Sequence, residues 1–453
     1  MTVCGVSLIL LPFYTALLPP SAMGTAEIFI TTAVLLMPLF SFYAPQATFR
    51  FLAQGAQNAV RTGGALLGVG LLLLLCLIPL LERFPTLYPY RYLLYFYVCA
   101  SLLRSFSAHI LRARGQFGIF ALQQSFCSLL TALFQLLFLR ATRLGVVGYL
   151  LGILLGDSVT FVILAACFFP FSRWEKHFDP VLCGKMLRYA LPLMPAALLW
   201  WAMGAVEKYF LLYYHGTASM GVYAVAGRFP SLIGFATGVF LEVWHYAALQ
   251  AQKGSEGELY GHVYALMLPF AIGAGVAVSV VAPFLILRVL ASAYGEATRA
   301  LGLLSVGAVC AGLSSFLDSV YTLRLRSVYS LISASGAATL HVLLSYFLVP
   351  RWGIVGAAAS GAIAYAGLFF LRLWHTSRML SFPRYTRKSA LSLTFLLIGG
   401  IWMAKGYVLL SVATALGALL PMAGLLWQST CFLYRRTRVI LHNILKRKEY
   451  TAQ

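Results

Sequence analysis

The sequence predicts an all-α polytopic membrane protein, because its composition excludes a soluble fold. Hydrophobic residues make up 61% of the 453 residues and charged residues only 10%, and the mean hydropathy is +0.86. Polar side chains could not cover so much apolar surface in water. Apolar runs long enough to cross about 30 Å of hydrocarbon as a helix recur along the chain. The alternation with a period of two residues that is typical of a membrane β-barrel is absent from the sequence.

The apolar runs between polar breaks predict about 14 transmembrane helices. Their expected ranges are 4–20, 25–47, 62–81, 86–110, 117–139, 144–170, 189–214, 220–249, 261–287, 299–323, 328–349, 354–378, 389–404 and 407–431. The connections are short, and the longest, 171–188, has no room for a soluble domain. A catalytic domain outside the bilayer is therefore not expected.

The basic residues predict the orientation of the helices. If the N-terminus lies inside, most of the 33 Lys and Arg residues fall in inner loops and in the tail. The positive-inside rule then places both termini in the cytoplasm. The stretches FPRYTRK and RRTRVILHNILKRK flank helices and would face an anionic leaflet. Membrane lipids thus explain the net charge of +21 without nucleic acid as a partner.

Three short segments recur in the same order about 200 residues further along. SAMG recurs as ASMG, LRAR as LRLR and RLGVVG as RWGIVG, at offsets of 197, 212 and 208 residues. This indicates duplication of a six-helix unit, and an even number of helices gives both copies the same orientation. We expect two such lobes around a central cavity, which is the layout of a transporter. The expected parts are the N-lobe at 1–170, a cytoplasmic connection at 171–188, the C-lobe at 189–380, two further helices at 381–431 and a basic cytoplasmic tail at 432–453.

Three longer stretches resemble a known group of transporters. They read LLPFYTALLPPSAMG, then LPLMPAALLWWAMGAVEKYFLLYYHGTASMGVYAVAGRFPSLI, then SYFLVPRWGIVGAAASGAIAY. Their order resembles the Wzx-like oligosaccharide flippases of the multidrug/oligosaccharidyl-lipid/polysaccharide exporter (MOP) superfamily. An acidic-basic-aromatic motif, here beginning at Glu207-Lys208, and a basic residue before proline, here Arg228 in GRFP, are typical of that group.

The resemblance implies a function in the synthesis of surface polysaccharide, such as the O-antigen of lipopolysaccharide. A member of this group moves an undecaprenyl-diphosphate-linked oligosaccharide from the inner to the outer leaflet of the bacterial cytoplasmic membrane. Such a headgroup cannot cross hydrocarbon unaided, so the protein must supply a polar cavity that opens to one leaflet at a time. Cations in that cavity can offset the diphosphate charge. No cofactor and no catalytic residue is expected, and one chain is expected to form the transport unit.

Two opposite charges stand side by side in the seventh span, at Glu207 and Lys208. Adjacent helical positions point about 100° apart, so each charge needs a partner elsewhere. If the following turn is centred near residue 217, Glu207 and Arg228 both lie ~15 Å from it. We therefore expect Glu207 to pair with Arg228, while Lys208 either lines the cavity or extends to the interface. We expect Arg228 to bind substrate phosphate, and a purely structural ion pair is the alternative.

Five further residues are candidates for the site. Glu242 and His245 share one face of the eighth span; without matching ligands elsewhere we expect no metal, and proton or sugar binding competes with a capping role. Arg50 closes the second span, either as a cytoplasmic anchor or to capture a headgroup. The single acids Asp157 and Asp318 could carry a coupling proton or sodium ion, and hydrogen bonds to neighbouring Ser or Thr are the alternative.

Two other classes of function remain in competition with a flippase. A drug/cation antiporter of the same superfamily would favour an acidic, aromatic cavity, whereas Lys208 and Arg228 make this one partly basic. A membrane polyprenyl-phosphate glycosyltransferase or polymerase would generally need a sizeable external loop, and no predicted loop is large enough. The sequence therefore favours transport over catalysis.

Overall fold

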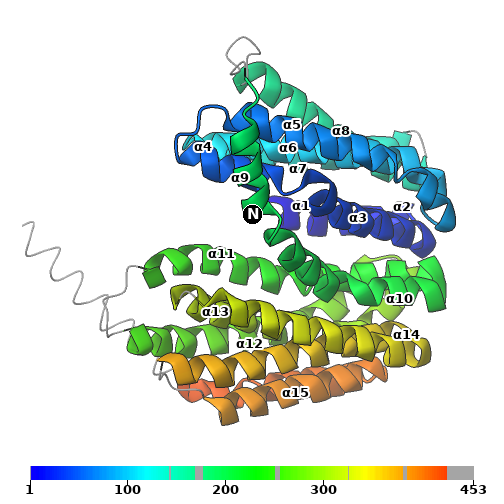
Figure 1. Ribbon diagram of the computed structural model, residues 1–453. Coiled ribbons are helices and arrows are strands. Elements are labelled where there is room, and N and C mark those ends of the chain that lie inside the picture. The colour runs from blue at the N-terminus through cyan, green and yellow to red at the C-terminus, as the bar shows by residue number, and fades with distance from the viewer. Residues whose placement is uncertain are drawn as a thin grey trace, which may run out of the picture. The chain divides into compact units, whose positions relative to one another are not determined.

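The structure is a computed structural model that describes residues 2–141, 144–168, 177–249, 256–324, 326–380 and 385–425. Within these ranges all regular structure is helical (Figure 1), which confirms the predicted all-α class. Nine of the described helices are long and apolar enough to cross a membrane. The expected tail at 432–453 and the first part of the expected connection at 171–188 lie outside the described residues.

The chain separates into two compact units that differ from a simple division of the sequence into halves. Unit 1 comprises Met1–Arg228, Leu287–Glu296 and Ala338–Ala357, and unit 2 comprises Phe229–Ile286, Ala297–Ala337 and Ala358–Gln453. Helices α12 and α14 therefore contribute to both units.

Most of the helices coincide with the predicted spans. The first expected span holds two helices, Thr2–Ile9 and Leu11–Leu17, and the second, expected at 25–47, breaks after Ser41 before a separate helix at Ala44–Ala53. The first ten are α1 Thr2–Ile9, α2 Leu11–Leu17, α3 Pro20–Ser41, α4 Ala44–Ala53, α5 Ala59–Leu75, α6 Arg91–Ala113, α7 Phe117–Ala141, α8 Gly145–Phe168, α9 Pro180–Ala190 and α10 Leu193–Arg228. The rest are α11 Ser231–Leu249, α12 Glu256–Val289, α13 Thr298–Leu323, α14 Ser327–Leu380, α15 Thr386–Ala404 and α16 Val408–Gly417. Short 3₁₀ turns at Pro79–Arg83, Tyr88–Tyr90, Ser292–Ala297 and Leu420–Met422 connect some of them.

Glycines divide the two longest helices where the sequence predicts turns. α10 is interrupted at Gly216 (φ 78°) and α14 at Gly353 (φ 53°). A positive φ is easily reached only by glycine, so the chain can turn there between two spans. The turn expected near residue 217 is thereby confirmed. A second break follows Arg228, because Pro230 cannot donate the hydrogen bond that would continue the helix into α11.

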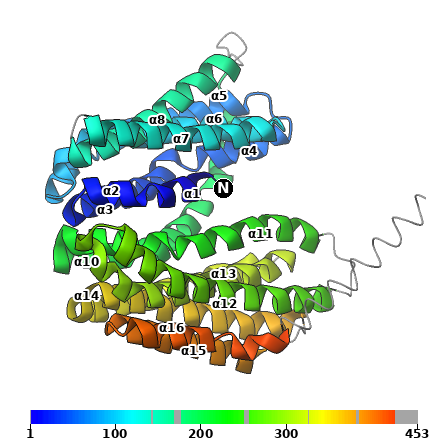
Figure 2. The same ribbon diagram turned by 180° about the vertical axis from the view of Figure 1, so that it is seen from behind.

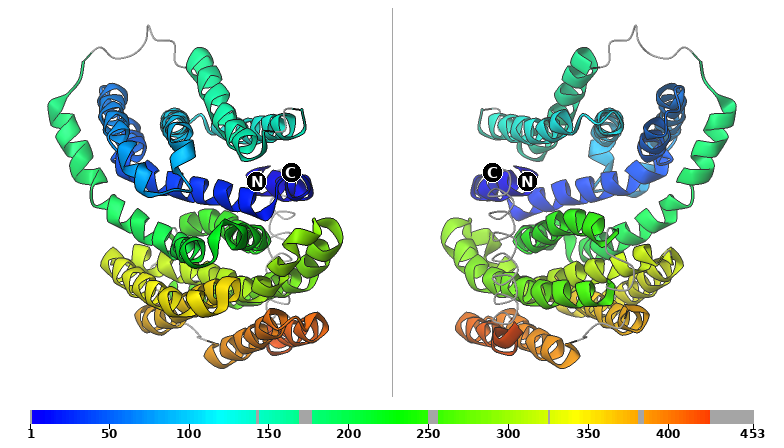
Figure 3. Two further views of the ribbon diagram at one scale, coloured as in Figure 1. Left: turned by 90° about the vertical axis from the view of Figure 1, so that its right-hand side faces the viewer. Right: turned by 90° about the vertical axis from the view of Figure 1, so that its left-hand side faces the viewer.

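The segment expected as a connection at 171–188 holds a helix in its second half. α9 begins at Pro180, and the Asp179 side chain caps it by accepting a hydrogen bond from the Leu182 backbone N–H at 3.0 Å. Its buried Met186 packs in a small cluster with Ala47 of α4. Figure 3 shows α9 leading into α10 as one curved stretch. This helix was not predicted from the sequence, because it is too short and too polar for a membrane span.

Each unit has its own packing. In unit 1, α3 packs against α10, and α7 packs against α8 (Figure 2). In unit 2, the core contains an aromatic cluster in which Trp244 and Phe316 are buried, with their ring centroids 5.3 Å apart. The Trp244 indole N–H donates to the Ser319 hydroxyl, which satisfies the one polar atom that this buried ring carries.

Candidate functional site

One carboxylate in unit 1 binds two cations. The Lys208 Nζ lies 2.8 Å from Glu27 Oε1, and the Arg228 Nη2 lies 3.1 Å from Glu27 Oε2. Glu27 is thus shared between two positive side chains, and the three charges sum to +1. We call Glu27, Lys208 and Arg228 the cationic cluster.

The sequence places each member of the cationic cluster in a simple way. Glu27 lies in the second turn of α3, which begins at Pro20, and Lys208 lies in the first half of α10. Arg228 is the last residue of α10, where a basic side chain interacts favourably with the carbonyl end of the helix. Close packing of α3 on α10 brings the three together.

The cationic cluster is accessible although it lies in apolar helices. The exposed fractions of the side chains are 13% for Glu27, 20% for Lys208 and 31% for Arg228. A charge left alone in the middle of a bilayer costs about 2.5–3.5 kcal/mol on insertion scales, so the shared carboxylate keeps the two cations in place. Their partial exposure leaves both able to contact an anionic ligand.

The expected pair of Glu207 and Arg228 is wrong. Glu207 instead accepts a hydrogen bond from the Tyr223 hydroxyl at 3.3 Å, and its Oε2 lies 3.6 Å from the His341 Nε2. The two residues contact different neighbours, since Arg228 binds Glu27 and Glu207 lies against His341. Because adjacent residues point about 100° apart, Lys208 turns toward α3 and Glu207 toward α14. Extension of Lys208 to the interface is not what the structure shows.

The two acids proposed for ion coupling are each bound by an arginine. The Arg104 Nε lies 2.8 Å from Asp157 Oδ1, and the Arg372 Nη2 lies 2.9 Å from Asp318 Oδ1. Hydrogen bonds to small side chains were the expected alternative, and Ser330 does donate to Asp318 at 2.6 Å. The first pair joins the fourth and sixth spans, and the second joins the tenth and twelfth. Each ion pair thus joins two helices within one unit, with the arginine on the earlier helix in the first pair and on the later helix in the second.

A cavity of about 310 Å³ lies in unit 1 between α1, α2, α6, α7 and α8. It is lined by Val6, Ser7, Tyr14, Arg104, Gln124, Cys127, Ser128, Thr131, Ala132, Gln135, Tyr149, Ile153 and Asp157. The Tyr14 hydroxyl donates to Gln135 Oε1 at 2.6 Å. Tyr14 and Tyr149 of this lining interact electrostatically with Arg228 of the cationic cluster. The volume of the cavity falls within the lower range of small-ligand pockets.

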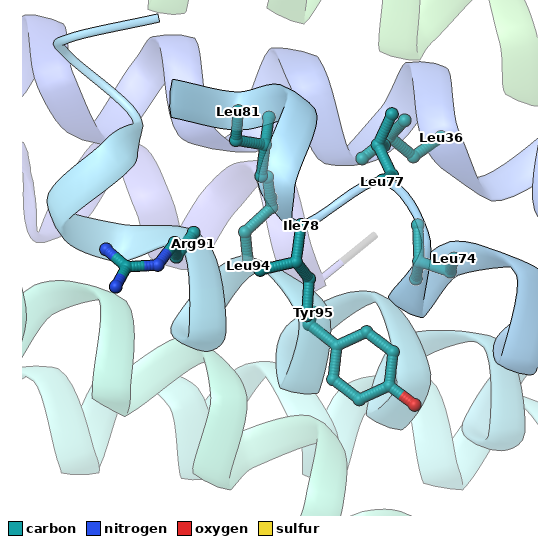
Figure 4. A pocket seen from close by; sticks show the side chains of 8 residues that line it. All are labelled: Leu36, Leu74, Leu77, Ile78, Leu81, Arg91, Leu94 and Tyr95. Atoms are coloured by element: carbon teal, nitrogen blue, oxygen red, sulfur yellow. The ribbon is translucent and has the colours of Figure 1, made fainter. Parts of the chain in front are cut away.

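A second recess in unit 1 does not form a site. It measures about 10 Å³ and is lined mainly by leucines of α3, α5, α6 and the segment between α5 and α6 (Figure 4). That is room for about one water molecule, and an apolar lining would not hold it. We interpret this recess as imperfect packing.

The remaining candidate residues have no described contact with the cationic cluster. Arg50 is exposed on α4, with its guanidinium stacked 4.4 Å from the centre of the Tyr189 ring. Glu242 is exposed on α11. The side chain of His245 lies outside the described part of the chain. Among the described residues no group of three metal-ligating side chains occurs.

Sequence reasoning overlooked Glu27, His341, Arg104 and Arg372. All four carry the signal that identified Glu207 and Asp157, namely an ionisable side chain inside an apolar run. Glu27 stands early in the second span, close to a predicted break. A strict survey of every ionisable residue in the spans would have found them.

These features define a multi-pass membrane protein with a partly exposed cationic cluster in its helices. No protein-family model and no curated protein sequence matches this chain. Among solved structures, the lipid II flippase MurJ in an inward closed conformation is similar, with a TM-score of 0.68 and 16% identity over 94% of this chain and 98% of that one. An outward-facing multidrug resistance MATE transporter of the MOP superfamily has a TM-score of 0.59 and 18% identity over 84% and 93%.

An inward-facing MATE transporter is similar to the same degree. Its TM-score is 0.61 at 16% identity, over 84% of this chain and 95% of that chain. The chain therefore has the fold of the MOP-superfamily transporters, and the expected fold is confirmed. Sequence identities this low support a shared fold only, so the nature of the substrate must be inferred from the site.

Proposed function

We propose that this protein is a Wzx-like flippase that moves an undecaprenyl-diphosphate-linked oligosaccharide from the cytoplasmic to the outer leaflet of the bacterial cytoplasmic membrane. The observation that carries the proposal is the cationic cluster, in which Lys208 and Arg228 share Glu27 within apolar helices. The excess positive charge of these three side chains suits an anionic ligand. The termini are placed in the cytoplasm by the distribution of basic residues.

The cationic cluster offsets the negative charge of the diphosphate, which is the part of the substrate that opposes transfer across the membrane. A diphosphate in hydrocarbon is strongly disfavoured, and charge-assisted hydrogen bonds from Lys and Arg replace part of its hydration. Glu27 holds both cations when no substrate is bound. The diphosphate competes with Glu27 for them, so the cations are never left without a negative partner during the cycle.

The cavity in unit 1 supports a glycosylated ligand. Its lining offers hydroxyl and amide groups, including those of Tyr14, Gln135 and Tyr149, which are the groups that bind sugars. Arg50, exposed on α4 and stacked on Tyr189, serves as the first contact for the headgroup at the cytoplasmic side. The two lobes alternate access around this path, as one chain.

A drug/cation antiporter is the competing proposal, because MATE transporters have the same fold. Its substrate would be cationic, and the cationic cluster would repel it. An enzyme acting on polyprenyl phosphates is the competitor from another class. The described connections between spans are short 3₁₀ turns and loops, which favours transport over catalysis.

The decisive experiment locates the lipid-linked oligosaccharide in cells that lack this protein. We expect it to accumulate in the inner leaflet, where an impermeant sugar-oxidising reagent cannot reach it in intact cells, and to return to the outer leaflet when the wild-type chain is restored. An unchanged leaflet distribution with altered drug resistance would favour the antiporter. Loss of the oligosaccharide itself would favour the enzyme.

A further inference from the structure

A second group of ionisable side chains in unit 1 is separate from the cationic cluster. Glu207 of α10 and His341 of α14 approach each other at 3.6 Å, measured from Oε2 to Nε2. Their side chains are 8% and 1% exposed. This distance is just beyond the range of a hydrogen bond, so the two groups face each other at close range without forming one.

Three polar atoms of this pair have no hydrogen-bond partner among the described residues. They are Glu207 Oε2 and both ring nitrogens of His341. The other carboxylate oxygen accepts one bond, from Tyr223 at 3.3 Å. Buried polar atoms are nearly always bonded, and each exception calls for an explanation. Without an added proton, the ionised carboxylate has no donor and the neutral imidazole has one N–H, so a proton added to this pair would give it a second donor.

The basic partner distinguishes Glu207 from three other acids described within the spans. Glu27, Asp157 and Asp318 are bound by Lys or Arg, whose charge is permanent at physiological pH. The partner of Glu207 is a histidine, whose charge changes between about pH 5 and 8. Only this pair, among those four described acids, can take up a proton without displacing a fixed cation.

We propose that Glu207 and His341 form a proton-binding site that couples proton movement to flipping. This rests on the proposed transport function. One proton enters the pair from water on one side of the membrane and leaves to water on the other, so the pair alternates between a net charge of −1 and 0. The pair also joins α10 to the part of α14 that belongs to unit 1, Ala338–Ala357, and so its charge biases how these helices pack.

The ionisable neighbours transmit this change to the cationic cluster. Lys208 follows Glu207 on α10 and interacts electrostatically with it and with Arg228; Glu27 on α3 lies against Lys208. Tyr223, on the second half of α10, is the remaining ionisable contact of Glu207. When the pair gains a proton, less negative charge faces Lys208, and the cationic cluster attracts an anion more strongly.

The first test detects the proton without any substrate. Infrared difference spectra of the full-length protein in liposomes are recorded between about pH 5 and 8. We expect a pH-dependent carboxyl band that disappears in Glu207→Gln and changes its midpoint in His341→Gln. His262→Gln is the matched control, because this histidine is exposed and contacts a backbone carbonyl of its own helix. The proposal is overturned if Glu207 stays ionised throughout this pH range and its carboxylate band is the same in His341→Gln as in the wild type.

The second test measures coupling in the same liposomes. A trapped pH dye reports proton entry under an acid-outside gradient, and a fluorescent undecaprenyl diphosphate with an impermeant quencher reports flipping. We expect lipid-dependent proton entry in the wild type and in His262→Gln, and a loss of at least tenfold in Glu207→Gln and His341→Gln, which still flip the lipid without a gradient. Flipping with unchanged proton entry in both variants overturns the coupling alone. A wild type that does not flip the lipid instead overturns the proposed function, while the infrared result still decides on the proton site.

Discussion

Gly24 of α3 and Gly221 of α10 lie at the same position in two similar short segments, and their backbones are in direct contact. They end the SAMG and ASMG segments, 197 residues apart. A Cβ atom on Gly24 would overlap the Thr217 carbonyl, and one on Gly221 would overlap the Pro20 carbonyl. This contact sets the close approach of α3 and α10 on which the cationic cluster depends.

Gly221→Ala should therefore destabilise the protein. We expect a loss of about 1–3 kcal/mol in the free energy of unfolding, as for other overpacked sites. Gly204→Ala on the same helix is the control, since no atom lies within 4 Å of the added Cβ, and it should be neutral or slightly stabilising. Thermal unfolding in lipid nanodiscs measures both. Equal behaviour of the two variants would contradict the close contact.

Glu27→Gln should remove the shared counter-charge of Lys208 and Arg228. Breaking a fully buried pair costs about 3–5 kcal/mol, and the loss here is smaller because both cations are partly exposed. The double variant Glu27→Gln/Lys208→Met should recover part of the lost stability, which corresponds to a coupling energy of about 0.5–3 kcal/mol between the two residues. In a second cycle, the stability losses of Glu207→Gln and Arg228→Gln should be additive, because these residues do not pair. Protein abundance and unfolding in a double-mutant cycle decide between the two patterns.

Arg228→Ala should impair export of surface polysaccharide while the protein still inserts in the membrane. The diphosphate would lose a charge-assisted contact of about 1.5–3 kcal/mol, which corresponds to a roughly ten- to hundred-fold weaker interaction. Export is compared with Arg378→Ala at equal protein abundance, since Arg378 is exposed and stacks on Trp374. Normal export by the Arg228 variant would exclude it from substrate binding.

Arg372→Lys should destabilise the protein almost as much as Arg372→Met. The guanidinium is fully buried, binds Asp318, and donates to the Ser333 hydroxyl and to the backbone carbonyls of Ser314 and Ser330. A lysine has no planar fork to reach them together. We expect a loss of about 3–5 kcal/mol for Met, which leaves the aspartate unpaired. Chemical unfolding measures the loss, and rescue by Lys would show that a point charge is sufficient.

The segment 171–188 and the C-terminal tail should both be cytoplasmic. Single cysteines introduced there should react with an impermeant maleimide only after the inner membrane is opened. Labelling of the tail in intact cells would overturn both the span count and the orientation, because an even number of spans keeps both termini on one side.

Much of the architecture could be predicted from the sequence because it depends on position along the chain. The turn near residue 217, found at Gly216, is an example. The positions of the charged residues within the spans also follow directly from the sequence. The side-chain partners could not be predicted in the same way. Adjacent residues point about 100° apart, so Glu207 and Lys208 face different helices, and helix packing decides which helices these are.

The sequence by itself therefore determined the all-α class of the protein, most of its spans and the presence of charges inside them, because hydrophobicity and helical rise are local properties. Only the tertiary structure decided the partners: Glu27 for Lys208 and Arg228, His341 for Glu207, and Arg104 and Arg372 for the two aspartates. Partners on different helices, far apart in the sequence, are set by which helix faces pack together. In this chain a pair of glycines without side chains, Gly24 and Gly221, permits the approach that brings Glu27 to its two cations.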